Sequence, residues 1–286
     1  MNGKNSELEK IGLSEEEFNY LCALLREKAG IFIDSGKISL LQTRLLKRLT
    51  VTKSLVFRDY IKVLKSDVSG TEISEFVNAM TTNKTDFFRE IEHFNFINRD
   101  FIKKLYLDNV ASGQLMVWSA ACSSGEEPYS IAIHLNELLE NEQVFAGFDF
   151  RILGTDINSQ MIKKCNLGVF EQSRFEETPK IYVQKYFEKG KGANEGYYRA
   201  NSKLKEKIKF RELNLLKPNF LIPIKFDIIF LRNVLIYFEP DVILSVIQNI
   251  KSHLKHGGYL FIGHSDTLNN IDHGLELVEA SIFRRK

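Results

Sequence analysis

The fold of this chain is decided by residues 117–130, which read VWSAACSSGEEPYS. The apolar start is typical of a buried strand, and the small residues that follow are typical of a tight loop. Pro128 is typical of the first turn of a helix. The loop matches neither glycine-rich fingerprint of phosphate-binding loops. Glu126 and Glu127 open the helix instead, where each negative charge gains about 0.3–1 kcal/mol from the helix dipole. One interpretation is therefore that the two carboxylates only cap the helix.

From about residue 114 onwards, strands and helices alternate along the chain. Helical segments such as 129–139 and 241–254 lie between runs that are rich in β-forming residues, namely 115–118, 151–154, 208–212, 226–231 and 259–263. This alternation predicts an α/β fold with a doubly wound, Rossmann-like parallel sheet that is covered on both faces.

Two segments depart from the alternation. Residues 275–286 (LELVEASIFRRK) predict one further strand, antiparallel and at or near an edge of the sheet. Residues 187–203 are rich in glycine and then in aromatic residues, which favours a small β-hairpin. We therefore expect a small β-subdomain inserted into the sheet domain.

Residues 14–80 read as helices only, so an all-α domain precedes the sheet. Ser14 and Glu17 form a capping box at the start of the first helix. The second helix, over 37–50, carries leucines on one stripe and basic residues on its other face. Those basic residues are Lys37, Arg44, Lys47 and Arg48. Two more amphipathic stretches follow at 55–66 and 70–82.

The bulk composition excludes several classes of protein. The chain has 286 residues and a formal net charge of +2, so no global charge points to nucleic acid or to a membrane surface. Its apolar runs are too short to cross a bilayer, and residues 1–10 lack the apolar core of a signal peptide. The three cysteines lie far apart without a C-x-x-C pair, which argues against disulfides and a zinc site. We expect a cytoplasmic monomer without a bound metal.

The charge of the loop favours a cationic ligand over a phosphate. Two carboxylates would repel a pyrophosphate at the helix N-terminus, where phosphate binders leave room for the anion. A ligand with a positive centre, an amine and ribose hydroxyls would be attracted instead, and S-adenosylmethionine (SAM) is such a ligand. Asp156 follows the second strand, where an acidic residue can accept both ribose hydroxyls. The alternative for Asp156 is a helix N-cap.

Five blocks in register give the chain a specific resemblance to a known family. They are MTTNKTDFFRE (80–90), WSAACSSGEEPYSIAI (118–133), GTDIN (154–158), FDIIFLRNVLIYF (226–238) and GGYLFIGHSDTL (257–268). Together with the helical stretch 29–49, they resemble the CheR family, the chemotaxis receptor glutamate methyltransferases. The resemblance implies a helical receptor-docking domain over 1–80, a linker and first cofactor-contacting segment over 81–113, and a SAM-dependent methyltransferase domain over 114–286.

The resemblance also implies roles for individual residues. Asp156 would bind the ribose of SAM, and Glu127 would contact the cofactor, although Glu126 is close enough that the choice between them stays open. Arg89 would clamp the cofactor or the substrate carboxylate, and Tyr237 would orient the substrate oxygen. The remaining residues expected at the cofactor are Asn83, Thr85, Asn214, Leu215, Arg232 and Asn233.

The implied reaction is methyl transfer from SAM to a glutamate side chain, which yields a methyl ester and S-adenosylhomocysteine. A free glutamate has a pKa of about 4.3 and is therefore already anionic at neutral pH. Such a carboxylate can attack without a general base, which agrees with the lack of an evident catalytic histidine or cysteine constellation. Positioning should then dominate the catalysis.

The implied partner is a chemotaxis receptor. Between residues 37 and 65 basic residues dominate, with Asp59 opposing them, and a charge run of this kind is usually a solvated helix face. The functional alternative is a docking face for the receptor's acidic coiled coil, formed by Lys37, Arg44, Lys47 and Arg48. In some members of the family the inserted hairpin also binds a peptide at the receptor's C-terminal tail by β-augmentation.

Three rival functions are less well supported. A nucleic-acid methyltransferase would carry Asn/Asp-Pro-Pro-Tyr/Phe after the fourth strand, where this chain has RNVLIYF, and its basic patch lacks stacking aromatics. A nicotinamide oxidoreductase would need the missing glycine fingerprint. A non-catalytic adaptor that binds SAM or the receptor remains the main alternative.

Overall fold

The computed structural model describes residues 12–108, 113–140, 145–217, 220 and 222–286. The start of the predicted helical domain (1–11) and the end of the predicted linker (109–112) lie outside the described residues. The chain divides into two compact units. One comprises residues up to Thr82 together with Tyr237–Val242, and the other comprises Asn83–Ile236 and Ile243–Lys286.

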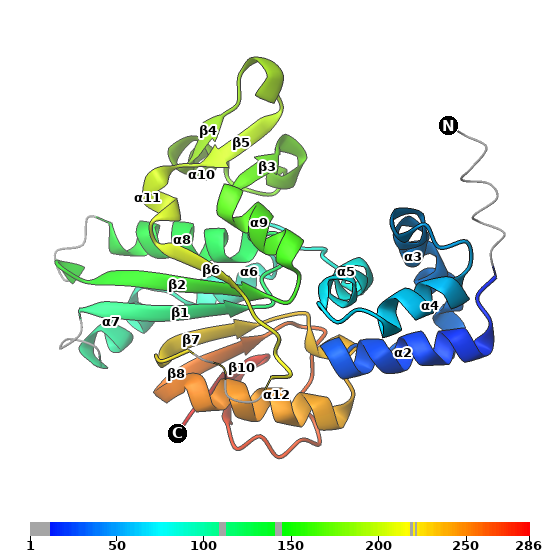
Figure 1. The fold of residues 1–286 in the computed structure, drawn as a ribbon. Helices are drawn as coiled ribbons and strands as arrows, with labels where there is room; N and C mark the ends of the chain where they lie inside the picture. Colours follow the sequence, from blue (N-terminus) through cyan, green and yellow to red (C-terminus); the bar gives the residue numbers. More distant parts are fainter. Residues whose placement is uncertain (1–11, 109–112, 141–144, 218–219, 221) are drawn as a thin grey trace. The chain divides into compact units, whose positions relative to one another are not determined.

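The first unit is built from helices, as the sequence predicts. They are α2 (Glu15–Ala29), the short 3-10 helix η1 (Ser35–Lys37), α3 (Ile38–Thr52), α4 (Phe57–Lys65) and α5 (Thr71–Met80) (Figure 1). The predicted capping box is present, because Glu17 N donates to Ser14 Oγ over 3.3 Å and Ser14 N donates to Glu17 Oε2 over 2.9 Å. The leucine stripe of α3, formed by Leu41, Leu45 and Leu49, is fully buried.

Two basic residues of α3 have partners inside this unit. Arg44 donates to Met80 O and, over 3.0 Å, to Thr82 Oγ1. Arg48 pairs with Glu72 and, over 3.4 Å, with Glu75, and its side chain is only 13% exposed. Tyr60 Oη also donates to Glu72, over 2.8 Å. Both glutamates lie on α5, so the local pattern of basic residues over 37–50 did not show them as partners. Arg48 is a structural residue of the helical unit.

The second unit contains a seven-stranded sheet of order β6-β2-β1-β7-β8-β10-β9. Its strands are β1 (Gln114–Ala120), β2 (Asp149–Asp156), β6 (Ile208–Glu212), β7 (Phe226–Leu231), β8 (Leu254–Ile262), β9 (Glu276–Glu279) and β10 (Ile282–Arg284). The first five are parallel to one another, whereas β10 is antiparallel to both β8 and β9. The C-terminal segment therefore forms two strands, where the sequence predicted one.

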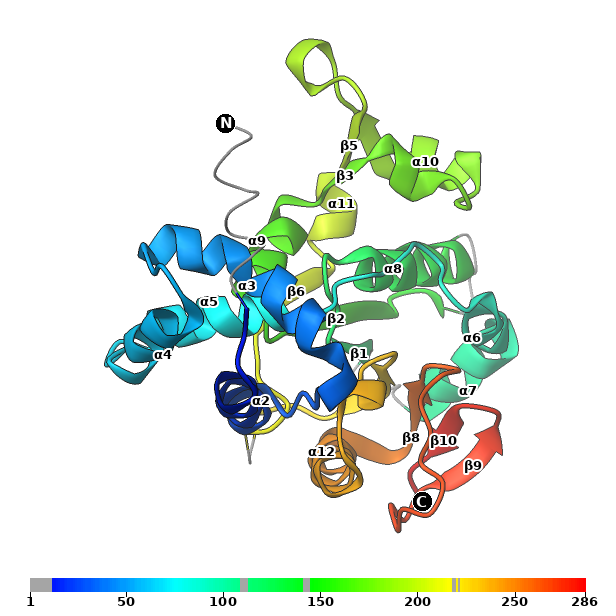
Figure 2. The same cartoon turned by 90° about the vertical axis from the view of Figure 1, so that its right-hand side faces the viewer.

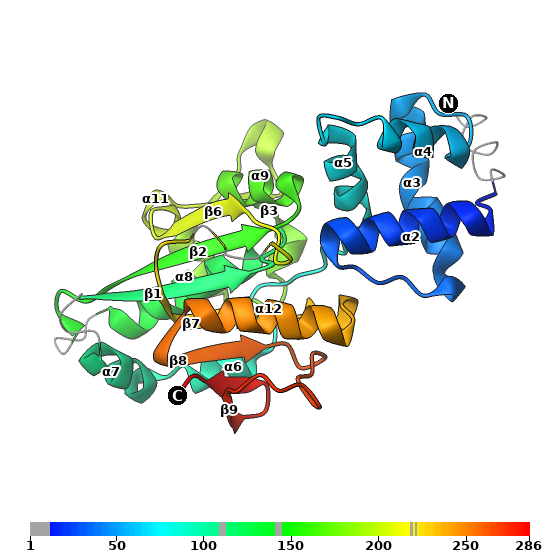
Figure 3. The same cartoon turned by 60° about the horizontal axis from the view of Figure 1, so that its bottom comes forward.

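Helices cover both faces of this sheet, as predicted. Figure 3 shows α12 (Pro240–His253) in front of the strands and α8 (Glu126–Leu139) behind them. Three further helices of this unit are α6 (Ile91–Phe96), α7 (Arg99–Asp108) and α9 (Ser159–Leu167). All six residues of β7 are buried, which is typical of a central parallel strand.

The strand order reverses between β1 and β7. From β1 the chain moves outwards through β2 to β6, and from β7 it moves the other way to β8. The loops at the carboxyl ends of β1 and β7 therefore diverge, and ligands of doubly wound sheets bind in the crevice at such a point. The loop 121–125 begins there.

A separate three-stranded antiparallel sheet forms the inserted β-subdomain. Its order is β3-β5-β4, with β3 (Val169–Glu171), β4 (Phe187–Lys189) and β5 (Tyr197–Ala200), and Figure 2 shows it together with α10 (Lys180–Tyr186). The predicted hairpin is present as β4 and β5, but it ends at Ala200, and 202–205 form the helix α11 (Ser202–Lys205). Strand β3 was not predicted, because three residues are too few for a periodic pattern.

Phenylalanine side chains form the core of the β-subdomain. Phe87 stacks on Phe175 with ring centroids 4.7 Å apart, and it meets Phe170 and Phe187 edge-on at 5.0 and 5.6 Å. Phe87 belongs to the segment 81–90, so this packing fixes that segment against the subdomain.

Among the residues that the structure describes, no helix is both long enough and apolar enough to cross a lipid bilayer.

Candidate functional site

The loop between β1 and α8 is held in a tight arch at the switch point. Ala121, Ser123 and Gly125 have φ values of 60°, 50° and 104°. The arch is tied to β2, because Cys122 N donates to Thr155 O over 2.9 Å and Ser123 N donates to Asp156 Oδ2 over 2.7 Å. Strained backbone of this kind persists only where its surroundings over-determine it, and it clusters at functional sites.

The structure excludes the capping alternative for Asp156. The N-cap of α9 is Asn158, whose side chain accepts from Gln160 N and Met161 N over 3.0 and 3.2 Å. Asp156 instead accepts from Ser123 N and, over 2.8 Å, from Asn158 N. Burial raises the pKa of Asp156 above its usual value, although these N–H groups oppose the rise. Each carboxylate oxygen keeps a lone pair for a further donor.

Glu127 and Glu126 have different partners. Glu127 Oε1 accepts from Ser119 Oγ over 2.6 Å, and its Oε2 lies 3.0 Å from Arg232 Nη1. Glu126 accepts from Arg174 Nε and Nη2 over 3.0 and 2.7 Å and is only 2% exposed. Glu126 is thus tied towards the β-subdomain, whereas Glu127, at 13% exposure, lies among the strand ends. This keeps Glu127 as the candidate for cofactor contact.

Arg232 is the centre of a buried charge network. Its side chain is 2% exposed and bridges Glu127 and Glu90, with Nη2 3.0 Å from Glu90 Oε2. It also donates to Arg89 O, while Asn233 Nδ2 donates to Glu90 Oε1 over 3.0 Å. Burial alone would raise the pKa of Glu90, but the bonds from Asn233 and Arg232 bring that pKa below its usual value. Burial raises the pKa of Glu127, and Arg232 offsets only part of the rise.

The segment 81–90 is a fixed loop and not the start of a helix. Helix α6 begins at Ile91, and Phe88 and Glu90 have φ values of 53° and 55°. Ser123 Oγ donates to Asn83 O over 3.0 Å, and Arg174 donates to Thr85 O. The predicted residues Asn83 and Thr85 therefore lie beside the arch.

The remaining candidates of the sheet unit lie nearby. Leu213 N donates to Asp156 O over 2.9 Å, which places Asn214 and the buried Leu215 at the strand end beside Asp156. Arg89 is half-buried, and its Nη1 donates to Lys84 O over 3.3 Å. The structure thus brings the candidates of this unit to the carboxyl ends of β1, β2, β6 and β7.

Five candidates belong to the helical unit. Tyr237 ends the short 3-10 helix η5 (Leu235–Tyr237), and its carbonyl oxygen accepts from Phe32 N over 2.9 Å. The proposed place of Tyr237 beside the substrate stays a prediction. The other four are Lys37, Arg44, Lys47 and Arg48.

Sequence reasoning missed several residues of the network. Glu90 follows Arg89 directly at the end of the block MTTNKTDFFRE, so its place in that block could have predicted that it lies at the site. Asp266 lies in the quoted GHSDTL block and accepts from Gly263 N and Ile236 N over 2.9 and 3.1 Å. Arg174 had no signal of its own, because nothing around it in the sequence marks a partner of Glu126.

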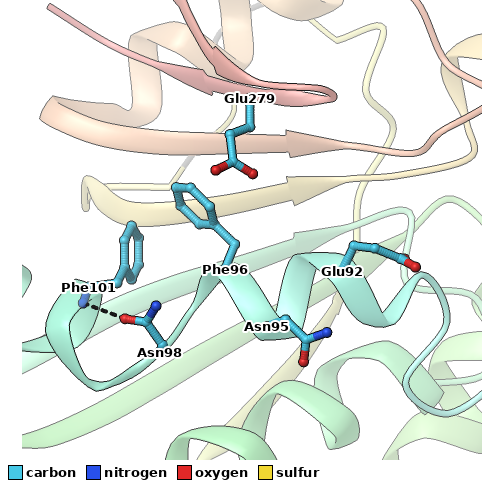
Figure 4. A pocket seen from close by; sticks show the side chains of 6 residues that line it. All are labelled: Glu92, Asn95, Phe96, Asn98, Phe101 and Glu279. Carbon is cyan, nitrogen blue, oxygen red and sulfur yellow. Dashed lines mark hydrogen bonds between the residues drawn. The ribbon is translucent and has the colours of Figure 1, made fainter.

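One open hollow on this unit lies away from the predicted site. Its volume is about 550 Å³, and it is lined by Glu92, Asn95, Phe96, Asn98, Phe101 and Glu279. Figure 4 shows Glu279 of β9 reaching towards Phe96 of α6, and Asn98 accepting from Phe101 N. None of the predicted site residues lines this hollow.

Comparisons with known proteins identify the family. Residues 83–283 match the SAM-binding domain of CheR methyltransferases, and residues 16–81 match their all-alpha domain. A chemotaxis protein methyltransferase of Klebsiella aerogenes is 34% identical over 275 residues, covering 96% of this chain and 91% of that protein. Those of Borreliella burgdorferi and Escherichia coli are each 32% identical, covering 96% of this chain and 96% and 92% of those proteins.

These matches span both units, and they agree with the mostly parallel sheet and the all-helical opening. The chain belongs to the CheR methyltransferase family.

Proposed function

We propose that this protein transfers a methyl group from SAM to glutamate side chains in the cytoplasmic domains of chemotaxis receptors. The observation that carries the proposal is the anionic group at the strand ends, where Asp156 and Glu127 flank an arch without a phosphate-binding fingerprint. The relatives named as chemotaxis protein methyltransferases support both the reaction and the kind of substrate.

The residues at the strand ends fit a cationic adenosyl cofactor. Asp156 would accept the ribose hydroxyls with its remaining lone pairs, and Asn214 and Leu215 would border the adenine. Asn83, Thr85 and Arg89 would hold the cofactor from the fixed loop, together with Glu127, Arg232 and Asn233. The bound cofactor supplies a methyl group on a sulfonium, which is an activated leaving group.

The protein's part in the reaction is orientation. The substrate glutamate is already ionised at neutral pH, so no side chain has to remove a proton. Arg89 would hold a carboxylate through charge-assisted hydrogen bonds, and Tyr237 would orient the attacking oxygen. Holding the reactants in line can supply about 7–11 kcal/mol in favourable cases.

The helical domain would dock the acidic coiled coil of the receptor. Lys37 and Lys47 are exposed, and Arg44 is half-buried. Arg48 is withdrawn from this surface by its pairing with Glu72. The β-subdomain has β3 and β4 at its edges, and a receptor tail peptide would add a strand to one of them. We place the protein in the cytoplasm as a monomer that is recruited to membrane receptor arrays.

Reversing the exposed charges of Lys37, at the end of η1, and Lys47, on α3, should weaken docking alone. With Lys37→Glu and Lys47→Glu combined, we expect receptor methylation at low salt to slow by about five- to tenfold, because opposite charge steers association. The difference should shrink at high salt. Stability should change by less than about 0.5 kcal/mol, since both side chains are exposed. The matched control combines Lys103→Glu on α7 with Lys163→Glu on α9, a double reversal of exposed charges that should leave the rate unchanged. Equal slowing in both proteins would refute the docking face.

The proposed function is tested by adding labelled SAM and receptor-enriched membranes to the purified protein. Base-labile label on the receptor is expected, as for a methyl ester. Label on RNA would favour a nucleic-acid methyltransferase, and binding without transfer would favour the adaptor.

In calorimetry, Asp156→Ala should bind SAM at least about 100-fold more weakly, because hydrogen bonds to a charged group contribute about 1.5–3 kcal/mol each. Wild-type affinity in that variant would remove Asp156 from the site.

A further inference from the structure

Three potential metal ligands converge beside the charge network of Arg232. Glu90 precedes α6, His93 lies in its first turn, and His264 follows β8. One ligand atom from each side chain lies within 4.8 Å of the others. The two imidazole rings meet edge-on with centroids 5.0 Å apart. Among the residues that the structure describes, this is the one group of its kind.

His93 is buried without a hydrogen-bond partner. Its side chain is 1% exposed, and neither ring nitrogen has a partner. Nδ1 faces Glu90 Oε2 at 3.7 Å, which is too long for a hydrogen bond. Leaving a buried polar group unsatisfied costs about 1–3 kcal/mol, so a bound ligand is expected at the ring nitrogens of His93.

The imidazole of His93 is in the state that metals bind. Burial lowers its pKa to about 4, and the nearby Arg232 contributes to this fall. The ring is therefore neutral at neutral pH, with a lone pair on one nitrogen. His264 is exposed, so its ring has room to turn towards a common centre.

The surroundings carry an excess of negative charge. Arg232 is shared between Glu127 and Glu90, so one guanidinium faces two carboxylates. Asp266 adds a third, and its pKa is raised by burial and, to a smaller degree, by the negative charge of Glu90. Glu90 Oε2 accepts from both Nε and Nη2 of Arg232, whereas Oε1 accepts from Asn233 Nδ2 and keeps a lone pair for an ion. At His93 itself Arg232 opposes a positive charge and Glu90 favours one, so the bonds from the three ligands have to supply the affinity for an ion.

We propose that Glu90, His93 and His264 bind a divalent transition-metal ion of the zinc class. Two imidazole nitrogens and one carboxylate oxygen are a ligand set that zinc uses, with a fourth position left for water. A tetrahedral ion holds its ligand atoms about 3.3 Å apart, so His264 moves inwards on binding. The site does not depend on methyl transfer. It also revises the expectation of no metal, which rested on cysteine spacing alone.

The test uses Co²⁺ as a spectroscopic probe on the untagged, chelator-treated chain of 286 residues. We expect one Co²⁺ per chain with visible absorption bands of a four- or five-coordinate ion, and displacement of Co²⁺ by Zn²⁺. His264→Gln should weaken Co²⁺ binding at least tenfold. His264 is exposed, so this variant should fold, and circular dichroism checks that it does.

The matched control is His256→Gln. His256 is also exposed, and its Nδ1 lies 2.7 Å from Lys286 O, away from the proposed ligands. The His256→Gln variant should bind Co²⁺ with the same affinity as the wild-type protein. A wild-type protein without the absorption bands, or a His264→Gln variant with unchanged binding, would overturn the proposal. A buried water beside His93 would then account for its unpaired nitrogens.

Discussion

Replacing Arg232 with methionine is expected to lower the free energy of unfolding of the sheet unit by about 3–5 kcal/mol. The Arg232 side chain is 2% exposed and bridges Glu90 and Glu127. Methionine fills much of the same space but carries no charge, so two buried carboxylates lose their counter-ion. Removing one partner of a buried pair is costly because the other charge stays behind without compensation.

The unfolding of this unit can be followed by its own fluorophore. Trp118 is the single tryptophan of the chain, is fully buried in β1, and donates from Nε1 to Thr155 Oγ1 over 2.9 Å. Denaturant titrations that monitor Trp118 fluorescence therefore report on the unit that holds Arg232. This separates its unfolding from that of the helical unit, which a single two-state fit of the whole chain would not do.

A surface ion pair supplies the control. Lys185 is 38% exposed and pairs with Glu137 and Glu140, so Lys185→Met should cost less than about 1 kcal/mol. Adding Glu90→Gln and Glu127→Gln to Arg232→Met should restore part of the lost stability, because the uncompensated charges are then gone. If Arg232→Met lowered the free energy of unfolding no more than Lys185→Met does, the Arg232 network would not stabilise the sheet unit.

The sequence predicted those parts of the site that depend on local order along the chain. The strand, the small-residue loop and the Glu-Glu-Pro helix start follow one another directly, and Asp156 ends the next strand. Because parallel strands place their carboxyl ends at one edge, strand–helix alternation was enough to bring the arch and Asp156 together. The family blocks added the residues of the segment 81–90.

The partners of the charged residues could not be predicted in the same way. Arg232 and Glu90 are 142 positions apart, and Arg174 and Glu126 are 48 apart. A local pattern contains no information on which distant side chain will face a buried charge, since packing of the whole unit decides it. The same limit explains Arg48, whose partner Glu72 lies on a different helix. It also explains why the sequence showed no histidine constellation, since His93 and His264 meet only in the folded unit.

Replacing Arg89 with alanine is expected to slow methyl transfer by about 100-fold, because a guanidinium that holds a carboxylate contributes about 1.5–3 kcal/mol per charge-assisted bond. The folded unit should tolerate the change. Arg89 is half-buried, and the bond from its side chain to Lys84 O is long, at 3.3 Å. The buried anchor at this position is its carbonyl oxygen, which accepts from Arg232 and is kept in the alanine variant. Trp118 unfolding curves should therefore match those of the wild type.

Two further variants isolate the role of the guanidinium. Arg89→Lys keeps the charge but loses the planar fork that binds a carboxylate with two parallel bonds, so its rate should fall between those of the alanine variant and the wild type. Arg151→Ala is the control, because Arg151 is 41% exposed, pairs with Asp149 and lies near the start of β2, at the opposite end from Asp156. Its rate should be that of the wild type.

The pattern of loss in Arg89→Ala tells which carboxylate the guanidinium holds. If Arg89 binds the cofactor, calorimetry will show weaker SAM binding, and the affinity loss will account for the slower transfer. If Arg89 instead positions the receptor glutamate, SAM will bind normally while methyl transfer at saturating SAM stays slow, since only the alignment of the attacking oxygen has changed. Wild-type turnover together with wild-type SAM affinity would exclude both roles and reduce Arg89 to a backbone anchor for Arg232.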